Sequence, residues 1–152
     1  MFPLRKKPLP VVAAKPLKIV VADDVHEIQQ LVALWLEQAG HSVTRVSTGG
    51  EVIQVVRDRP VDLVVTDLVM PGGDGLDAIL AVNRIRPSTR ILAISGGGPN
   101  MPADAGLRVA KGVGADGILL KPFDQQKLLA AVQKVIWDVE NSQTMVANIK
   151  LS

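Results

Sequence analysis

The sequence lacks cysteine and tyrosine, and its aromatic residues are only two phenylalanines and two tryptophans. The absence of cysteine excludes disulfide bonds and thiolate metal sites. A core must therefore be built from aliphatic side chains, and the 47% hydrophobic composition provides enough of them. No apolar run is long enough to span a bilayer, and Pro10 and Lys15 break up the N-terminal stretch where a signal peptide would lie. We expect one soluble, cytoplasmic domain from these 152 residues.

Charge is distributed unevenly along the chain. Residues 1–18 carry five basic and no acidic residues, which leaves 12 basic against 15 acidic residues in the remainder. Residues 1–16 also hold four prolines, so we expect a flexible basic tail there. Such a tail could touch a partner or an acidic membrane surface, but a solvated tail is the commoner case. The remainder has no basic stripe with interleaved aromatics, so direct binding of nucleic acid is not expected.

Four short apolar runs each end in reactive polar side chains. The runs 18–22, 61–66, 91–94 and 117–120 lead, in that order, into Asp23 and Asp24, Asp67, Ser95, and Lys121. Nearly continuous apolar runs of this length are typical of buried parallel strands. Ligands of open α/β sheets bind beyond the carboxyl ends of the strands. We therefore expect three carboxylates, a hydroxyl and an ammonium to converge at one edge of a sheet.

Helical patterns alternate with strand patterns along the chain. Strands are expected at about 18–22, 42–46, 61–66, 90–94 and 116–120, each followed by a helix. This alternation predicts an α/β fold, a doubly wound five-stranded parallel sheet in a three-layer α/β/α arrangement. The flavodoxin-like strand order 2-1-3-4-5 would place the first strand beside the third, so the three carboxylates become neighbours.

The first helix has two specific features in the sequence. Asp24 and Glu27 have the spacing of a capping box, which predicts that Asp24 caps the helix. Ile28, Leu31, Val32, Trp35 and Ala39 follow at helical spacing and are expected to face the core. The second helix is expected to begin at Thr48 or Gly49.

Three crowded carboxylates indicate a binding site for a cation. Like charges repel at neutral pH, and a divalent cation relieves that repulsion. Oxygen ligands alone suit Mg²⁺. A carboxylate beside Mg²⁺ can attack phosphorus and form an aspartyl phosphate. The charge of a transferred phosphoryl group would be met by Mg²⁺, by the Lys121 ammonium and by the Ser95 hydroxyl.

These residues give the chain a specific resemblance to a known family. The matching segments are Val20–Asp24, the D-x-x-M-P-x-x-D-G block from Asp67 to Gly75, Ser95, and Lys121-Pro122-Phe123. Each segment is weak evidence alone, but together, in order and at strand ends, they are specific. Over about residues 17–139 the chain resembles the receiver domain of two-component response regulators, in particular single-domain, chemotaxis-regulator-like members.

The resemblance implies roles in phosphoryl transfer. Asp67 would accept a phosphoryl group from a sensor histidine kinase or a phosphotransfer protein. Lys121 would contact a phosphoryl oxygen, and Ser95 would move to form a hydrogen bond with the group.

The resemblance also implies a Mg²⁺ site. Asp24 and Asp67 would bind the ion through their side chains. Val69 would bind it through its backbone carbonyl, and Asp23 through a water molecule.

The resemblance further implies how the signal leaves the domain. The helix at 103–112, the strand at 116–120 and the helix at 124–139 would form the face that contacts an unknown downstream protein, and this face could also support a homodimer. Residues 140–152 are expected to be a polar C-terminal tail without an output domain. Ile118 stands where the family usually has Tyr or Phe, so the usual aromatic switch is missing.

Two alternatives stay open from the sequence. A degenerate receiver would bind partners without being phosphorylated, but the complete set of three Asp, one Ser and one Lys argues against it. A phosphohydrolase of the haloacid dehalogenase type would need a second Asp two residues after Asp67, where this chain has Val69. We therefore expect no enzymatic activity beyond the domain's own phosphorylation and dephosphorylation.

Overall fold

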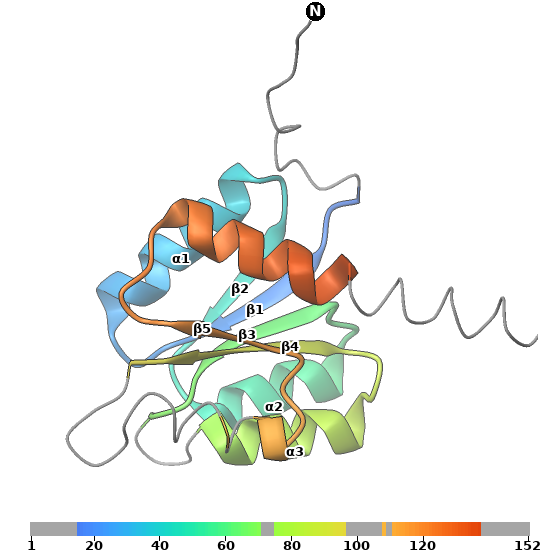
Figure 1. The fold of residues 1–152 in the computed structure, drawn as a ribbon. Helices are drawn as coiled ribbons and strands as arrows, with labels where there is room; N and C mark the ends of the chain where they lie inside the picture. Colours follow the sequence, from blue (N-terminus) through green and yellow to red (C-terminus); the bar gives the residue numbers. More distant parts are fainter. Residues whose placement is uncertain (1–14, 71–74, 97–107, 109–110, 138–152) are drawn as a thin grey trace, which may run out of the picture.

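A five-stranded parallel sheet organises the protein (Figure 1). The computed structural model describes residues 15–70, 75–96, 108 and 111–137. Its elements are β1 (Lys18–Ala22), α1 (His26–Gln38), β2 (Ser42–Val46), α2 (Gly49–Asp58), β3 (Leu63–Asp67), α3 (Gly75–Ile85), β4 (Arg90–Ser95) and β5 (Gly117–Leu120), and residues 125–137 form a further helix. The strand order β2-β1-β3-β4-β5 confirms the predicted flavodoxin-like topology.

Helices cover both faces of the sheet, which gives the predicted three layers. Helix α1 and the helix at 125–137 lie on one face, and α2 and α3 lie on the other (Figure 1). Alternate residues of each strand point to opposite faces. In β1, Ile19 and Val21 pack with the α1 side, whereas Val20 and Ala22 pack with the α2 and α3 side. The sheet therefore separates two aliphatic cores, one on each of its faces.

The start of α1 differs from the prediction. Val25, not Asp24, is the N-cap residue, and no side chain caps the helix. Asp23 takes part in the turn instead, because its Oδ1 accepts a hydrogen bond from the Val25 N–H at 2.9 Å. The predicted capping by Asp24 is therefore wrong, and its exposed carboxylate is left for another role. The predicted start of α2 is confirmed, because the helix begins at Gly49 with Thr48 as its N-cap residue, and Thr48 and Glu51 also form a full capping box.

The inward face of α1 is also rotated relative to the prediction. Its buried residues are Gln29, Val32, Ala33 and Leu36. Leu31 was expected in the core, but its side chain is 44% exposed. The cause is that apolar residues occur around most of this helix, so their spacing alone does not define which face is buried. One consequence is that a glutamine lies on the buried face.

Several predictions lie wholly or mostly outside the described residues. These are the basic tail, most of the helix at 103–112 and the C-terminal tail, together with the turn and the loop that glycine and proline indicate at 71–74 and after Gly96. The domain boundaries at 16–17 and 139–140 therefore stay predictions. The helical pattern at 124–139 would place Trp137 on an apolar face, but its side chain is 65% exposed. Within the described part of the chain, no helix combines the length and apolarity needed to cross a membrane.

A buried histidine ties the start of β1 to the turn before β2. His41 Nδ1 accepts a hydrogen bond from the Leu17 N–H at 3.0 Å. Burial lowers the pKa of His41 below its ordinary value of 6.5. A proton on Nδ1 would turn the acceptor into a donor that faces another N–H, so folding favours the neutral ring.

This arrangement predicts a pH dependence of stability. The unfolded chain takes up a proton at His41 near pH 6.5, and the folded protein does so only at lower pH. The free energy of unfolding should therefore fall as the pH drops below about 6.5. The H41N variant offers an amide oxygen in place of Nδ1. Its free energy of unfolding should be lower by roughly 1 kcal/mol at neutral pH, but it should lack the fall that protonation of His41 causes at lower pH. Urea unfolding between neutral and mildly acidic pH measures it, and parallel pH profiles for the two proteins would contradict it.

Candidate functional site

The parallel register brings the predicted site residues to one edge of the sheet. Ala22 pairs with Thr66, so the residues that follow β1 lie next to Asp67. Ser95 at the end of β4 pairs with Leu120, so Lys121 continues past the same edge. Residues separated by almost 100 positions in the sequence thus meet because the strand ends are aligned.

Three carboxylates form the centre of the site. One oxygen each from Asp23, Asp24 and Asp67 lies within 4.8 Å of the others. Asp23 and Asp67 are buried, with exposed fractions of 2% and 6%, whereas Asp24 is exposed. The cluster therefore combines two buried acids with one acid that is open to solvent.

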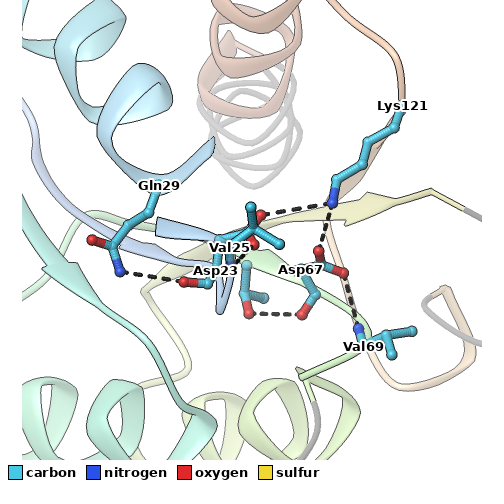
Figure 2. A network of polar contacts seen from close by, with 7 residues as sticks. Asp23, Val25, Gln29, Asp67, Val69 and Lys121 are labelled. Carbon is cyan, nitrogen blue, oxygen red and sulfur yellow. Dashed lines mark hydrogen bonds and ion pairs between the residues drawn. The ribbon is translucent and has the colours of Figure 1, made fainter. Parts of the chain in front are cut away.

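Lys121 reaches into this cluster from the end of β5 (Figure 2). Its Nζ lies 2.7 Å from Asp67 Oδ2 and 3.7 Å from Asp23 Oδ2. Burial alone would lower the pKa of Lys121, but the hydrogen bond to Asp67 and the charges of Asp67, Asp23 and Asp24 raise it overall. The ammonium is therefore charged at neutral pH and neutralises part of the cluster.

Backbone amides hold both buried carboxylates in place. Asp67 Oδ1 accepts a hydrogen bond from the Val69 N–H at 2.9 Å, just as Asp23 Oδ1 does from Val25 (Figure 2). Each acid therefore uses one oxygen to fix its own turn and directs the other towards Lys121.

The second oxygen of Asp23 is the least satisfied atom of the site. Among the described residues, Asp23 Oδ2 is buried and accepts no hydrogen bond, and its contact with Lys121 is long. Burial raises the pKa of Asp23, and the charges of Asp67 and Asp24 add to this, while the Val25 N–H and Lys121 oppose it. A buried acceptor without a donor is costly. An oxygen-rich cluster with a free buried oxygen fits a hard divalent cation such as Mg²⁺, or a water bound to it.

Two glycines allow other segments to approach the site closely. A Cβ at Gly75, the first residue of α3, would overlap the carbonyl oxygen of Asp67. A Cβ at Gly96 would lie 3.2 Å from the Lys121 Cδ, which is a tight contact. Gly75 therefore belongs to the support of the site, because a residue without a Cβ lets α3 begin against the Asp67 backbone.

The remaining predicted residues lie at the end of β4, in the turn after β3 and within β5. Ser95 is 3% exposed, and its carbonyl accepts a hydrogen bond from the Lys121 N–H at 2.9 Å. Val69 is 62% exposed beside Asp67. Ile118 is half-buried and packs against the aliphatic core on the α2 and α3 side. At this position β5 therefore carries an inward-packed aliphatic side chain.

The structure also reveals a site neighbour that the sequence interpretation missed. Gln29 is 4% exposed, and its side-chain nitrogen contacts the carbonyl oxygen of Asp23 at 3.3 Å (Figure 2). The available signal was its spacing of three, four and seven residues from Val32, Ala33 and Leu36, which places it on the buried face of α1.

Comparison with known proteins identifies a family for most of the chain. The family model for the response regulator receiver domain matches residues 19–133. The chain is 30% identical over 122 residues to the response regulator receiver protein CpdR of Brucella abortus (strain 2308), covering 78% of this chain and 96% of CpdR. It is 34% identical over 118 residues to the DNA-binding transcriptional regulator NtrC of Azospirillum brasilense, covering 78% of this chain and 24% of NtrC.

Solved structures give the same result for the fold. The chemotaxis response regulator CheY4 of Vibrio cholerae superimposes with a TM-score of 0.71 at 28% identity, over 80% of this chain and 99% of that one.

The matched lengths of the relatives differ widely. The chain spans 24% of NtrC and about half of further curated relatives, whereas it spans nearly all of CpdR.

The unsatisfied carboxylate of Asp23 should lower the stability of the protein when no divalent cation is bound. In the absence of divalent cations, D23N should raise the free energy of unfolding by roughly 1 kcal/mol, because it removes a buried like charge and keeps an acceptor for Val25. Added Mg²⁺ should stabilise the wild type and have little effect on D23N. Thermal unfolding with and without Mg²⁺ measures both effects.

Asp116 provides the matched control for this substitution. Its Oδ2 accepts a backbone hydrogen bond from Ile91 at 2.8 Å, away from the cluster. D116N should not be stabilising and should respond to Mg²⁺ as the wild type does. Equal Mg²⁺ stabilisation of D23N and wild type would contradict the assignment of Asp23 to the cation site.

Proposed function

The chain belongs to the receiver-domain family of two-component response regulators, and we propose that Asp67 is its phosphoacceptor and that phosphorylation switches its binding to a partner. Members of this family are signalling switches that interact with histidine kinases and bind Mg²⁺ at an acidic pocket. The observation that carries the proposal is the cluster of Asp23, Asp24 and Asp67 within 4.8 Å, with Lys121 at 2.7 Å from Asp67.

In the proposed reaction, a carboxylate oxygen of Asp67 attacks the phosphorus of a phosphohistidine on a kinase or phosphotransfer protein. The new P–O bond forms an acyl phosphate while the P–N bond breaks and its electron pair stays on the imidazole nitrogen. Mg²⁺, held by Asp24, Asp67, the Val69 carbonyl and, through water, Asp23, would supply positive charge to the phosphoryl oxygens.

Lys121 and Ser95 would then respond to the new charge. Before transfer, the Lys121 ammonium is bound to the Asp67 carboxylate. After transfer it can contact a phosphoryl oxygen, whose negative charge would favour the protonated ammonium. Ser95 is buried at the end of the neighbouring strand, so a contact with the phosphoryl group would pull on β4 and on the backbone hydrogen bond to Lys121.

The output is proposed to leave through the face of β5 and the last helix, together with the helix predicted at 103–112. Two apolar side chains on this face are well exposed, Leu120 at 41% and Trp137 at 65%. Because Ile118 packs into the core, the signal would pass through aliphatic packing. The downstream partner, a homodimer, and activity as a single cytoplasmic domain stay predictions.

Neither alternative function gains support at this site. A phosphohydrolase would need an acid or base two residues after Asp67, and Val69 offers only an exposed aliphatic side chain there. A degenerate receiver would not need Lys121 held against Asp67. The proposed function predicts that a stable phosphoryl adduct forms, whereas neither alternative function does.

Phosphorylation by a small donor tests the proposed acceptor. Wild-type protein with acetyl phosphate and Mg²⁺ should gain the mass of one phosphoryl group, and EDTA should suppress the gain. D67N should gain nothing, whereas D58N, which alters an exposed acid on α2, should behave as the wild type. Intact-mass spectrometry is the measurement. An unmodified wild type would favour a degenerate receiver, and free phosphate released in many turnovers from a generic phosphate monoester would favour the hydrolase.

The surroundings of Asp67 also predict the lifetime of the phosphoryl group. Neither Val69 nor Gly96 has a side chain that can hold an attacking water by a hydrogen bond. We expect an aspartyl phosphate that persists well beyond seconds, and a several-fold faster loss in V69N, which adds an amide beside Asp67. The decay of the phosphorylated mass after removal of the donor measures both, and a lifetime of seconds in the wild type would contradict the expectation.

A further inference from the structure

Gln29 is a buried polar residue that no step of the proposed reaction uses. It lies in the second turn of α1, and its amide nitrogen contacts three oxygens: Val46 O at 2.6 Å, Ser47 Oγ at 3.2 Å and Asp23 O at 3.3 Å. Two of these are carbonyl oxygens, which can only accept. The chemistry of its neighbours therefore determines the orientation of the amide.

These contacts connect the turn of Asp23 and Asp24 to the end of β2, the strand beside β1. Val46 is the last residue of β2, and its carbonyl also accepts a hydrogen bond from the Asp23 N–H at 3.3 Å. Ser47 precedes the N-cap of α2, and its N–H donates to the Glu51 side chain at 2.9 Å. Gln29 thus joins the ends of β1 and β2 and the start of α2.

The turn at Asp23 and Asp24 has little other support from α1. The helix has no side-chain cap, and Val25 at its N-cap is 40% exposed. The Asp23 side chain accepts the Val25 N–H, so the turn is held by the same carboxylate that faces the cluster. Gln29 holds the Asp23 backbone from the other side, without using a carboxylate oxygen.

We propose that Gln29 is a positioning residue for the divalent cation. Its side chain holds the turn that carries Asp23 and Asp24 in register with Asp67. This role rests on the proposed function, because it requires that the three carboxylates bind the ion. Mg²⁺ accepts little distortion of its octahedral ligand geometry, and Mn²⁺ takes the same kind of octahedral oxygen ligation. Groups that orient metal ligands typically change affinity by roughly tenfold or more when removed.

Direct binding of Mn²⁺ tests the role without measuring phosphorylation. Q29M keeps the length and volume of the side chain but removes its donors. We expect the dissociation constant for Mn²⁺, measured from the electron paramagnetic resonance of the free ion, to rise by about tenfold. Q30M, an exposed change at the next position of α1, should leave it unchanged.

A second control separates positioning from general stability. Thr89 is 2% exposed and donates a 2.7 Å hydrogen bond to the Val61 carbonyl, before β4 at the opposite edge of the sheet. T89V should lower the urea midpoint, as Q29M does, but should keep the wild-type affinity for Mn²⁺. Equal affinity of Q29M and wild type, or an equal loss in Q29M and T89V, would overturn the role of Gln29 and leave the proposed function standing. A wild type that binds no Mn²⁺ would overturn both.

A measurement on the wild type covers the case in which Q29M does not fold. In NMR spectra recorded during a Mg²⁺ titration, the side-chain amide of Gln29 should shift along the same saturation curve as the backbone amides of Asp23 and Asp24. A Gln29 side-chain signal that stays fixed while those amides shift would overturn the proposal.

Discussion

The structure depends on the balance between three carboxylates and one ammonium at a single edge of the sheet. Two of the acids are buried, and one ammonium cannot neutralise three negative charges. Asp23 keeps a buried oxygen that accepts no hydrogen bond from the described residues. Folding therefore assembles a site that is incomplete in charge. A divalent cation on the Asp23 and Asp24 side would complete it, and the cation and Lys121 together would then supply the positive charge that a phosphoryl group on Asp67 needs.

The scaffold tolerates this cost because its apolar cores are separate from the charged edge. Strand residues pack into two aliphatic clusters, one on each face of the sheet, while the polar residues follow the strands. The turns at the charged edge are held by short-range hydrogen bonds, from Val25 to Asp23 and from Val69 to Asp67. Gly75 lets α3 begin against the Asp67 backbone. The backbone of the site is therefore held by local contacts, while its charge stays unsatisfied among the described residues.

Strand order, the two-faced core and the converging polar residues could all be predicted from the sequence. Each depends on a pattern along the chain: apolar runs, turn residues, and acids at strand ends. The cap of α1 and its buried face could not be predicted, because they depend on which of several competing contacts forms. The spacing of Asp24 and Glu27 predicts a cap at Asp24, whereas the Val25 N–H is bound by Asp23 and Val25 becomes the N-cap residue. Apolar residues around α1 make several orientations of this helix equivalent. Gln29 was missed for the same reason, since its partners are two backbone carbonyls and a serine hydroxyl of other segments.

The central claim is that Asp67, with a divalent cation beside it, is the group that receives phosphate. Beryllofluoride imitates a phosphoryl group on a carboxylate, and its binding can be followed by fluorine NMR. Bound fluoride resonances should appear in the wild type only when Mg²⁺ is present, and they should be absent in D67N. Bound resonances of equal intensity in D67N, or in the wild type without Mg²⁺, would contradict the account.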